Sequence, residues 1–352
     1  MVNLDDRPAG GFALDTKPYV QHHPTFGYHY IPGMSMRLQR PGGGYYRIQI
    51  NAAGVRSDRE YTAAKPPHVT RIIVCGDSMS AGQFIDNVDR FSELLERRIP
   101  NLEVINLSLE GSGTDQQLLL YEHLGMTFEH DIVLLLPFLQ NLRRNLVEAR
   151  DAVDPRTRQM VLRPKPRFEL VDGELILRNV PVPATMPADR AAERATETPN
   201  PGLARLKTRI AGLPGAAVWR RAIQQVIPWE PFPEYRQPTH PAWQLMSALI
   251  RRFKERAGAR PLVVAPTFYS NYVRLRMGRA YWKRFSSLAS VPGVYPVDLL
   301  PYFCQGTVAD RMRAFQEPFD MHFSSIGHQL LAEAIEQELR SRRLLAATGA
   351  AG

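Results

Sequence analysis

Arg71-Ile72-Ile73-Val74-Cys75-Gly76-Asp77-Ser78-Met79-Ser80 joins a short apolar run to a sharp break in the pattern. A continuous apolar run of this length is typical of a strand buried on both faces of a parallel sheet. Open α/β sheets hold their ligands just beyond the carboxyl ends of their strands, and Ser78 is expected there. A serine hydroxyl is a poor nucleophile until a base and an oxyanion site surround it. A chemical role for Ser78 therefore depends on partners supplied by the rest of the chain.

Strand-like and helix-like patterns alternate along the sequence around this stretch. Several strand candidates are continuous apolar runs, which suits a parallel sheet covered by helices on both faces. The alternation predicts an α/β fold, a three-layer α/β/α sandwich with a central parallel sheet. Strands are expected at Arg71–Cys75, Leu102–Leu107, Asp131–Pro137, Pro261–Pro266 and Val294–Val297, and helices at Arg90–Arg98, Thr114–Leu124, Trp243–Arg256, Gly278–Leu288 and Ser325–Leu344.

Three regions differ in composition. Residues 1–67 are predicted to form an N-terminal arm with a β-hairpin extension, whose turn is Arg40-Pro41-Gly42-Gly43-Gly44. The core is expected over residues 68–145 and 242–345. An insertion over residues 146–241 separates the third strand from the fourth and is a candidate cap or lid over a substrate.

The insertion carries signals of its own. Asp172-Gly173 lies between two alternating runs within residues 167–177, which is a strong hairpin signal. A Pro-, Ala- and Thr-rich stretch at residues 181–203 is predicted to be a loop. Aromatic residues then gather in residues 219–235, where they either cradle a substrate or pack into a small core of the cap.

Composition excludes several classes of protein. The 352-residue chain has a net charge of +9, but its arginines are scattered and no nucleic-acid recognition module is found. The longest apolar run, around Ile132–Leu139, is too short to span a membrane, and Met1–Arg7 lacks the pattern of a secretory signal. We therefore expect a cytoplasmic protein with no nucleic-acid or membrane partner. Cys75 and Cys304 cannot build a zinc site or a disulfide framework, and no cofactor is expected. The oligomeric state is left open.

Two polar segments follow the second and third strand candidates. A glycine within Asn106–Gln117 would let the backbone approach a reacting group and point an N–H at it. The alternative is a plain strand-to-helix turn, with Ser112 or Thr114 as the helix N-cap. At the end of the third strand, the Asn141 carboxamide would donate to a developing oxyanion, or Asn141 simply forms a turn.

A third segment, Asp320-Met321-His322, precedes the last helix candidate. Residues i and i+2 of an extended segment project to the same side, so Asp320 would hold the His322 imidazole and leave its other nitrogen free as a base. The alternative is a pair of surface-loop residues. His328 falls inside the helix pattern and is interpreted as structural.

The order and strand context of these segments resemble the SGNH hydrolase family, also called the GDSL esterase/lipase family. Its signature is a Ser in Gly-Asp-Ser after the first core strand, a Gly after the second, an Asn after the third and an Asp/His pair before the last helix. The resemblance covers roughly residues 70–145 and 290–343. It implies the family's flavodoxin-like fold.

The resemblance also implies a role for each matching residue. Ser78 would be the nucleophile, His322 the base and Asp320 the residue that orients His322. The oxyanion hole would consist of the Ser78 and Gly111 N–H groups and the Asn141 amide.

Gly111 is assigned rather than Gly113 because it lies five residues after Asn106, as in the family's Asn-x-x-x-x-Gly block. Ile50–Arg56 and the hairpin Phe168–Leu177 further resemble a bacterial branch linked with surface polysaccharide or secondary-metabolite pathways.

The chain also departs from the family pattern. The usual Gly-x-Asn-Asp block is Leu139-Gln140-Asn141-Leu142 here, which leaves the positioning of Asn141 open. The last block is Asp-x-His rather than Asp-x-x-His, a spacing also found in related acyl-transferring members. Ser80 breaks the Gly-x-Ser-x-Gly elbow, which argues against the α/β-hydrolase class.

We therefore expect a serine hydrolase that cleaves an ester through an acyl-serine intermediate. The substrate would be a small molecule or carbohydrate bearing an O-acetyl or other short acyl group. The same residues would also serve an O-acyltransferase, in which a hydroxyl acceptor replaces water. A third reading is a non-catalytic binding protein on the same fold.

Overall fold

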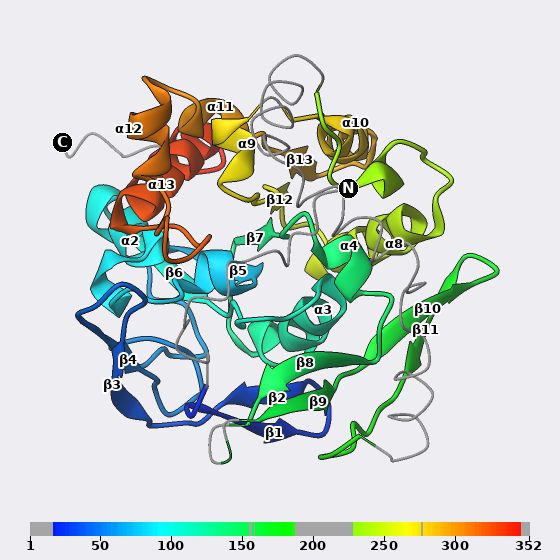
Figure 1. Ribbon diagram of the computed structural model, residues 1–352, viewed down its shortest axis with the longest axis horizontal. Coiled ribbons are helices and arrows are strands. Elements are labelled where there is room, and N and C mark those ends of the chain that lie inside the picture. The colour runs from blue at the N-terminus through cyan, green and yellow to red at the C-terminus, as the bar shows by residue number, and fades with distance from the viewer. Residues whose placement is uncertain (1–16, 155–156, 158, 187–227, 276, 346–352) are drawn as a thin grey trace, which may run out of the picture.

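The computed structural model describes residues 17–154, 157, 159–186, 228–275 and 277–345. Its centre is a five-stranded parallel sheet with the order β13-β12-β7-β5-β6 (Figure 1). The predicted sheet is confirmed, with each strand close to its expected bounds. The strands are β5 (Thr70–Gly76), β6 (Leu102–Asn106), β7 (Ile132–Leu136), β12 (Leu262–Val264) and β13 (Val294–Pro296).

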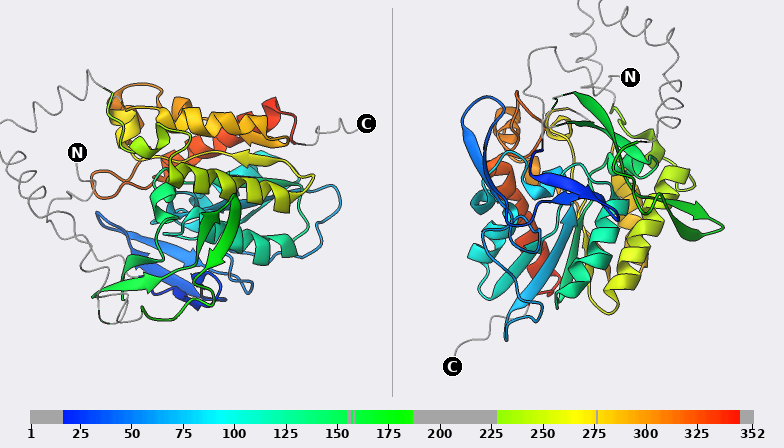
Figure 2. Two further views of the ribbon diagram at one scale, coloured as in Figure 1. Left: turned by 90° about the vertical axis from the view of Figure 1, so that its right-hand side faces the viewer. Right: turned by 90° about the horizontal axis from the view of Figure 1, so that it is seen from below.

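The central strands are apolar because both faces of the sheet are covered. Every residue of β6 and β7 is buried, and so is every residue of β5 except Thr70. Helices α2 (Phe91–Arg98) and α13 (Ser325–Ser341) pack together on one face, and α3 (Thr114–His123) and α8 (Pro241–Ala257) on the other (Figures 1 and 2). This is the three-layer α/β/α sandwich that the sequence predicts.

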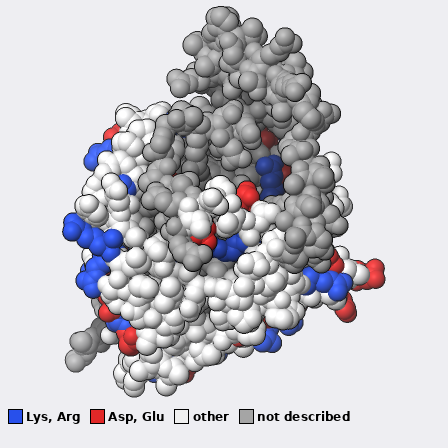
Figure 3. Space-filling model, turned by 60° about the horizontal axis from the view of Figure 1, so that its bottom comes forward, with Lys and Arg blue, Asp and Glu red and all other residues white. Residues whose placement is uncertain are grey.

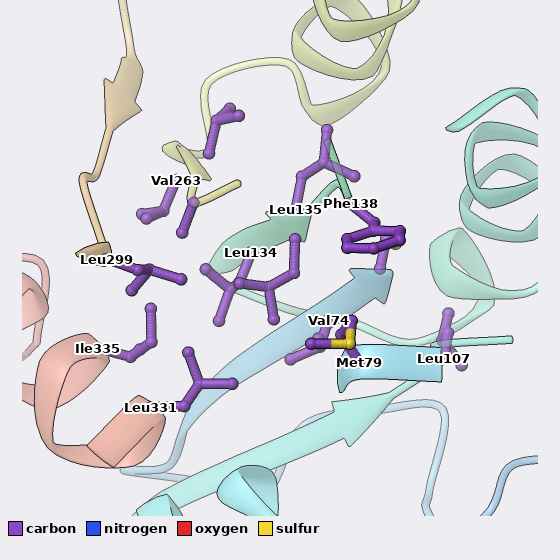
Figure 4. Packing of buried hydrophobic residues seen from close by; sticks show 14 of the residues in the cluster. Val74, Met79, Leu107, Leu134, Leu135, Phe138, Val263, Leu299, Leu331 and Ile335 are labelled. Atoms are coloured by element: carbon purple, nitrogen blue, oxygen red, sulfur yellow. The ribbon is translucent and has the colours of Figure 1, made fainter. Parts of the chain in front are cut away.

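The core joins α13 to the sheet through aliphatic side chains. Leu331 and Ile335 of α13 point toward the sheet, where Val74 and Leu134 lie (Figure 4). All four side chains are fully buried. Each such side chain contributes about 1.5–3 kcal/mol through the removal of apolar surface from water.

The chain order of the sheet reverses at β5. Strand β6 pairs on one side of β5 and β7 on the other, so the loops after these strands diverge at their carboxyl ends. Such a switch point is where open α/β sheets bind ligands.

Four antiparallel hairpins occur outside the sheet in the described part of the chain: β1 (Val20–His23) with β2 (Gly27–Tyr30), β3 (Ser35–Gln39) with β4 (Tyr45–Gln49), β8 (Ala149–Val153) with β9 (Met160–Pro164), and β10 (Arg167–Val171) with β11 (Glu174–Arg178). The β3–β4 and β10–β11 hairpins were expected. Strand β1, next to the buried Tyr19, was not among the elements expected from the sequence, and it pairs with β2. The N-terminal and inserted hairpins meet, since a Cβ on Gly27 would lie 2.7 Å from the Pro164 carbonyl oxygen.

The remaining elements are short. The loop predicted at residues 181–203 is described only as far as residue 186. The aromatic stretch at residues 219–235 is described from residue 228 onward, and there Phe232 and Tyr235 are buried. The domain boundaries stay predictions.

The short helices are α1 (Ser78–Ala81), α4 (Asn141–Arg144), α9 (Asn271–Arg274), α10 (Ala280–Ser286), α11 (Leu300–Phe303) and α12 (Val308–Met312), with 3-10 turns at Asn87–Asp89, Gly125–Thr127, Pro233–Tyr235 and Ser287–Ser290.

His328 fastens α13 to α2 and makes stability depend on pH. Its fully buried ring accepts the Phe91 N–H through Nδ1 at 3.1 Å, which requires an unprotonated Nδ1. Burial, helped by the charges of Arg90, Arg56 and His322, lowers the pKa of His328 to about 3. Between that pKa and the usual value near 6.5, only the unfolded chain binds the proton, so stability falls as the pH falls.

Because only the unfolded chain binds a proton on His328 in this pH range, we expect the free energy of unfolding to be about 2 kcal/mol lower at about pH 5 than at about pH 7.5. Urea unfolding at both pH values measures this loss. A His328→Gln variant, whose amide oxygen can still accept the Phe91 N–H, should lose less stability on acidification. Equal losses in the two proteins would contradict the assignment.

Candidate active site

Ser78 begins α1 directly after β5. Asp77 caps this helix, because its carboxylate accepts the Met79 N–H at 3.0 Å. Gly76 admits no side chain, since a Cβ there would lie 2.0 Å from the Ser80 Oγ. The Ser78 N–H lies in the first turn of α1, where a helix offers no acceptor of its own. The Gly-Asp-Ser sequence thus places Ser78, a residue that is 5% exposed, at the end of β5.

His322 reaches Ser78 from the loop before α13. Its Nε2 lies 2.8 Å from the Ser78 Oγ, although the two residues are 244 positions apart in the chain. Its Nδ1 hydrogen-bonds the Asp320 carboxylate, whose Oδ1 also accepts the His322 N–H at 2.9 Å. The Phe84 ring packs edge-on against the imidazole with centroids 5.9 Å apart. These contacts fix the ring so that Nε2 faces the hydroxyl, an arrangement that can remove the serine proton.

Gly111 lies in the loop between β6 and α3 and lines the same cavity as Ser78. Its φ of +81° favours glycine. The loop is tied to β5, because the Leu109 N–H donates to the Gly76 carbonyl at 3.0 Å and the Ser112 hydroxyl donates to it at 3.2 Å. The alternative that made Ser112 or Thr114 the N-cap of α3 is wrong. Gly113 takes that place, and the Gln116 side chain accepts its N–H.

Asn141 opens α4 at the end of the third-strand segment and is fully buried. Its Oδ1 accepts a hydrogen bond from the Arg144 Nη1 at 3.1 Å. Its Nδ2 has no acceptor among the described residues. A buried amide without a partner costs about 1–3 kcal/mol, so Nδ2 calls for an acceptor that the described residues do not supply.

Arg144 was not among the site residues expected from the sequence, and it is a candidate for the site on its contacts. Its Nη1 also donates to Asp77 at 2.8 Å and to the Ser112 carbonyl at 3.3 Å. One guanidinium group therefore joins the segments that follow β5, β6 and β7, which carry Asp77, Ser112 and Asn141. Burial raises the pKa of Asp77, and the Arg144 charge opposes that rise. Arg144 lies one helical turn after Asn141, and this i,i+3 spacing was the available signal.

A cavity of about 700 Å³ holds the site. Its lining includes Ser78, Gly111, Asp320 and His322. Arg144 also belongs to the lining, whereas Asn141 does not. The other walls come from the β3–β4 turn and the β8–β9 hairpin. Six basic residues line the cavity: Lys17, Arg40, Arg144, Arg150, Arg163 and Lys165. Basic side chains elsewhere are scattered over the face in Figure 3.

Within the described residues, no group of three or more His, Cys, Asp or Glu side chains could hold a metal ion. None of the helices in this part of the chain is both long and apolar enough to cross a membrane.

Comparison with known proteins gives structural likenesses only. No protein-family model and no curated protein matches the chain. A lipase/acylhydrolase from Enterococcus faecalis is 14% identical, covering 78% of this chain and 97% of that one, with a TM-score of 0.40. A lipolytic G-D-S-L family protein from Veillonella parvula is 10% identical over 76% and 97%, with a TM-score of 0.41.

A third structure, a salicylyl-acyltransferase from a tetracycline biosynthetic pathway, is 12% identical, covering 79% of this chain and 57% of that one, with a TM-score of 0.39.

Proposed function

We propose that the protein is a serine esterase acting through an acyl-serine intermediate. The observation that carries the proposal is the Ser78–His322–Asp320 relay, in which the His322 Nε2 lies 2.8 Å from the Ser78 Oγ and its Nδ1 binds Asp320. This geometry supports general-base activation of a serine. Its position at the sheet's switch point, inside a cavity, supports a substrate site.

Each step follows from these positions. The His322 Nε2 takes the Ser78 proton while the Ser78 Oγ attacks the ester carbonyl. The N–H groups of Ser78 and Gly111 and the Asn141 Nδ2 stabilise the oxyanion of the tetrahedral intermediate. The alcohol leaves with the proton from His322. Water, activated by the same nitrogen, then releases the acid and restores Ser78.

Covalent labelling tests the nucleophile directly. A fluorophosphonate should add one adduct to the protein, seen by intact-protein mass spectrometry and mapped to Ser78 by peptide analysis. A binding protein without an activated serine would stay unmodified. An unmodified protein, or an adduct on another residue, would therefore contradict the proposal.

We expect Asn141→Ala to lower kcat for an acetyl ester about 100- to 1000-fold, because one oxyanion donor is lost. The variant should fold, since Nδ2 has no partner among the described residues and the Arg144 Nη1, which loses the Asn141 Oδ1, keeps Asp77 and the Ser112 carbonyl as acceptors. Asn145→Ala is the matched control. It truncates a buried asparagine at the end of the same helix, whose amide contacts Asp115 and Met246. Full activity in Asn141→Ala would remove Asn141 from the oxyanion hole.

We assign a short-chain ester of a carbohydrate or small metabolite as the substrate class, because a cavity of about 700 Å³ matches small-molecule sites. The second candidate is O-acyl transfer. The observation that favours it is the low exposure of Ser78 and His322, 5% and 7%, which limits water at the acyl-serine. Product analysis with and without sugar alcohols as acceptors separates the two. An esterase releases only the acid, whereas a transferase forms the acylated acceptor.

A further inference from the structure

Arg150 and Arg163 lie directly opposite each other in the β8–β9 hairpin. Directly opposed residues of antiparallel strands project from the same face, so the two guanidinium groups are neighbours. Both residues line the cavity that holds Ser78 and His322. Like charges placed directly opposite are destabilising, and such a pair needs a compensating group.

Two other hairpins contain opposed arginines, and each compensates them differently. Arg167 and Arg178 of β10–β11 both bind the carboxylate of Glu169. Arg37 and Arg47 of β3–β4 are both exposed, where water screens their charges. The Arg150–Arg163 pair has neither solution, because both side chains are partly buried and neither forms an ion pair with a described residue.

Three nearby carboxylates already have partners. Glu110 pairs with Lys17 and accepts the Tyr19 hydroxyl. Asp77 pairs with Arg144, and Asp320 binds His322. Asp151 also lines the cavity, but it is opposite Leu162 in the register, so its side chain projects from the other face of the hairpin and forms no ion pair with Arg150 or Arg163.

Arg150 is held beside the catalytic centre. Its Nη1 donates to the carbonyl oxygen of Gly111, the residue assigned to the oxyanion hole. The Arg163 guanidinium lies over the Tyr28 ring, 5.1 Å from its centroid, and donates no hydrogen bond to a described residue. Burial and the nearby Arg144 lower the pKa of Arg150 to about 10, and Tyr28, Asp77 and Asp151 oppose this shift only in part. The remaining N–H donors of both side chains are therefore available to a ligand.

We propose that Arg150 and Arg163 form an anion subsite that binds a carboxylate or phosphate group of the ester substrate. The assignment to a substrate rests on the esterase function proposed above. Guanidinium groups bind both anions through paired N–H donors, which fix orientation as well as charge. An anion held there would place the rest of the molecule beside Gly111 and Ser78, and it would cancel the repulsion between the two arginines.

Paired esters that differ in one charge test the proposal. 4-Acetoxybenzoate and neutral 4-acetoxybenzamide place the charge on the alcohol side. Mono-4-nitrophenyl glutarate and 4-nitrophenyl pentanoate place it on the acyl side. In one of the pairs, the charged-to-neutral ratio of kcat/KM should fall about tenfold to hundredfold in Arg150→Gln and Arg163→Gln. Arg178→Gln, which removes one member of the pair bridged by Glu169, should keep the wild-type ratio.

Binding of inorganic phosphate supplies a readout that does not need activity. Phosphate at about 20 mM should raise the melting temperature of the wild type and of Arg178→Gln more than that of Arg150→Gln or Arg163→Gln, at matched ionic strength. Unchanged ratios in both ester pairs, or equal phosphate shifts in all four proteins, would overturn the subsite. A wild type that cleaves no ester and takes no fluorophosphonate, yet shows the selective phosphate shift, would overturn the esterase function and retain an anion site.

Discussion

A Ser78→Ala variant is expected to lose ester hydrolysis by roughly 10⁴- to 10⁶-fold in kcat, the loss typical when the nucleophile of a serine relay is removed. The reason is specific to the geometry. The His322 Nε2 would have no hydroxyl to activate, and no covalent intermediate would form. Fluorophosphonate labelling should disappear together with turnover.

The fold should tolerate this change. Ser78 loses only one oxygen, and Asp77 still caps α1 through the Met79 N–H. Ser80→Ala is the matched control, because its buried hydroxyl bonds Ser108 and the Asp77 carbonyl rather than His322. Retained hydrolysis in Ser78→Ala, with a melting temperature equal to the wild type, would show that another residue attacks the ester.

Asp320→Asn is expected to lower kcat by about 10⁴-fold while leaving KM within a few-fold. Asp320 accepts both the His322 backbone N–H and its ring Nδ1–H, which keeps Nε2 unprotonated and aimed at Ser78. An asparagine amide that donates to Nδ1 would favour the tautomer with its proton on Nε2, and that tautomer cannot accept the serine proton. We therefore propose that Asp320 is a positioning residue.

The split between kcat and KM separates this role from a structural one. Asp310→Asn is the control, since Asp310 caps α12 in the segment leading to the same loop without contacting the imidazole. A melting temperature near the wild-type value, with kcat reduced only in Asp320→Asn, is the expected result. A loss of both kcat and folded protein would assign Asp320 to loop stability instead.

Local patterns predicted the sheet well for a physical reason. A parallel strand covered on both faces must be apolar throughout, and β5, β6 and β7 show this directly in the chain. Turn chemistry also acts locally. Asp172 and Gly173 both adopt positive φ in the β10–β11 hairpin, as the Asp-Gly signal predicts.

Other elements could not be read from local patterns. Strand β1 carries no clear apolar alternation, and it forms because β2 offers backbone partners. The inserted β8–β9 hairpin brings Arg150 and Arg163 together through its register alone. Arg144 gains its importance only because three loops end within reach of one guanidinium.

The sequence by itself determined the strands of the core and the residue types able to form a serine relay. Tertiary structure decided that Ser78 and His322 meet, that an amide of Asn141 is buried without a partner, and that two arginines face one cavity. The division is physical: burial and turn preferences act between near neighbours in the chain, whereas these contacts depend on strand order and on helices packed across the sheet.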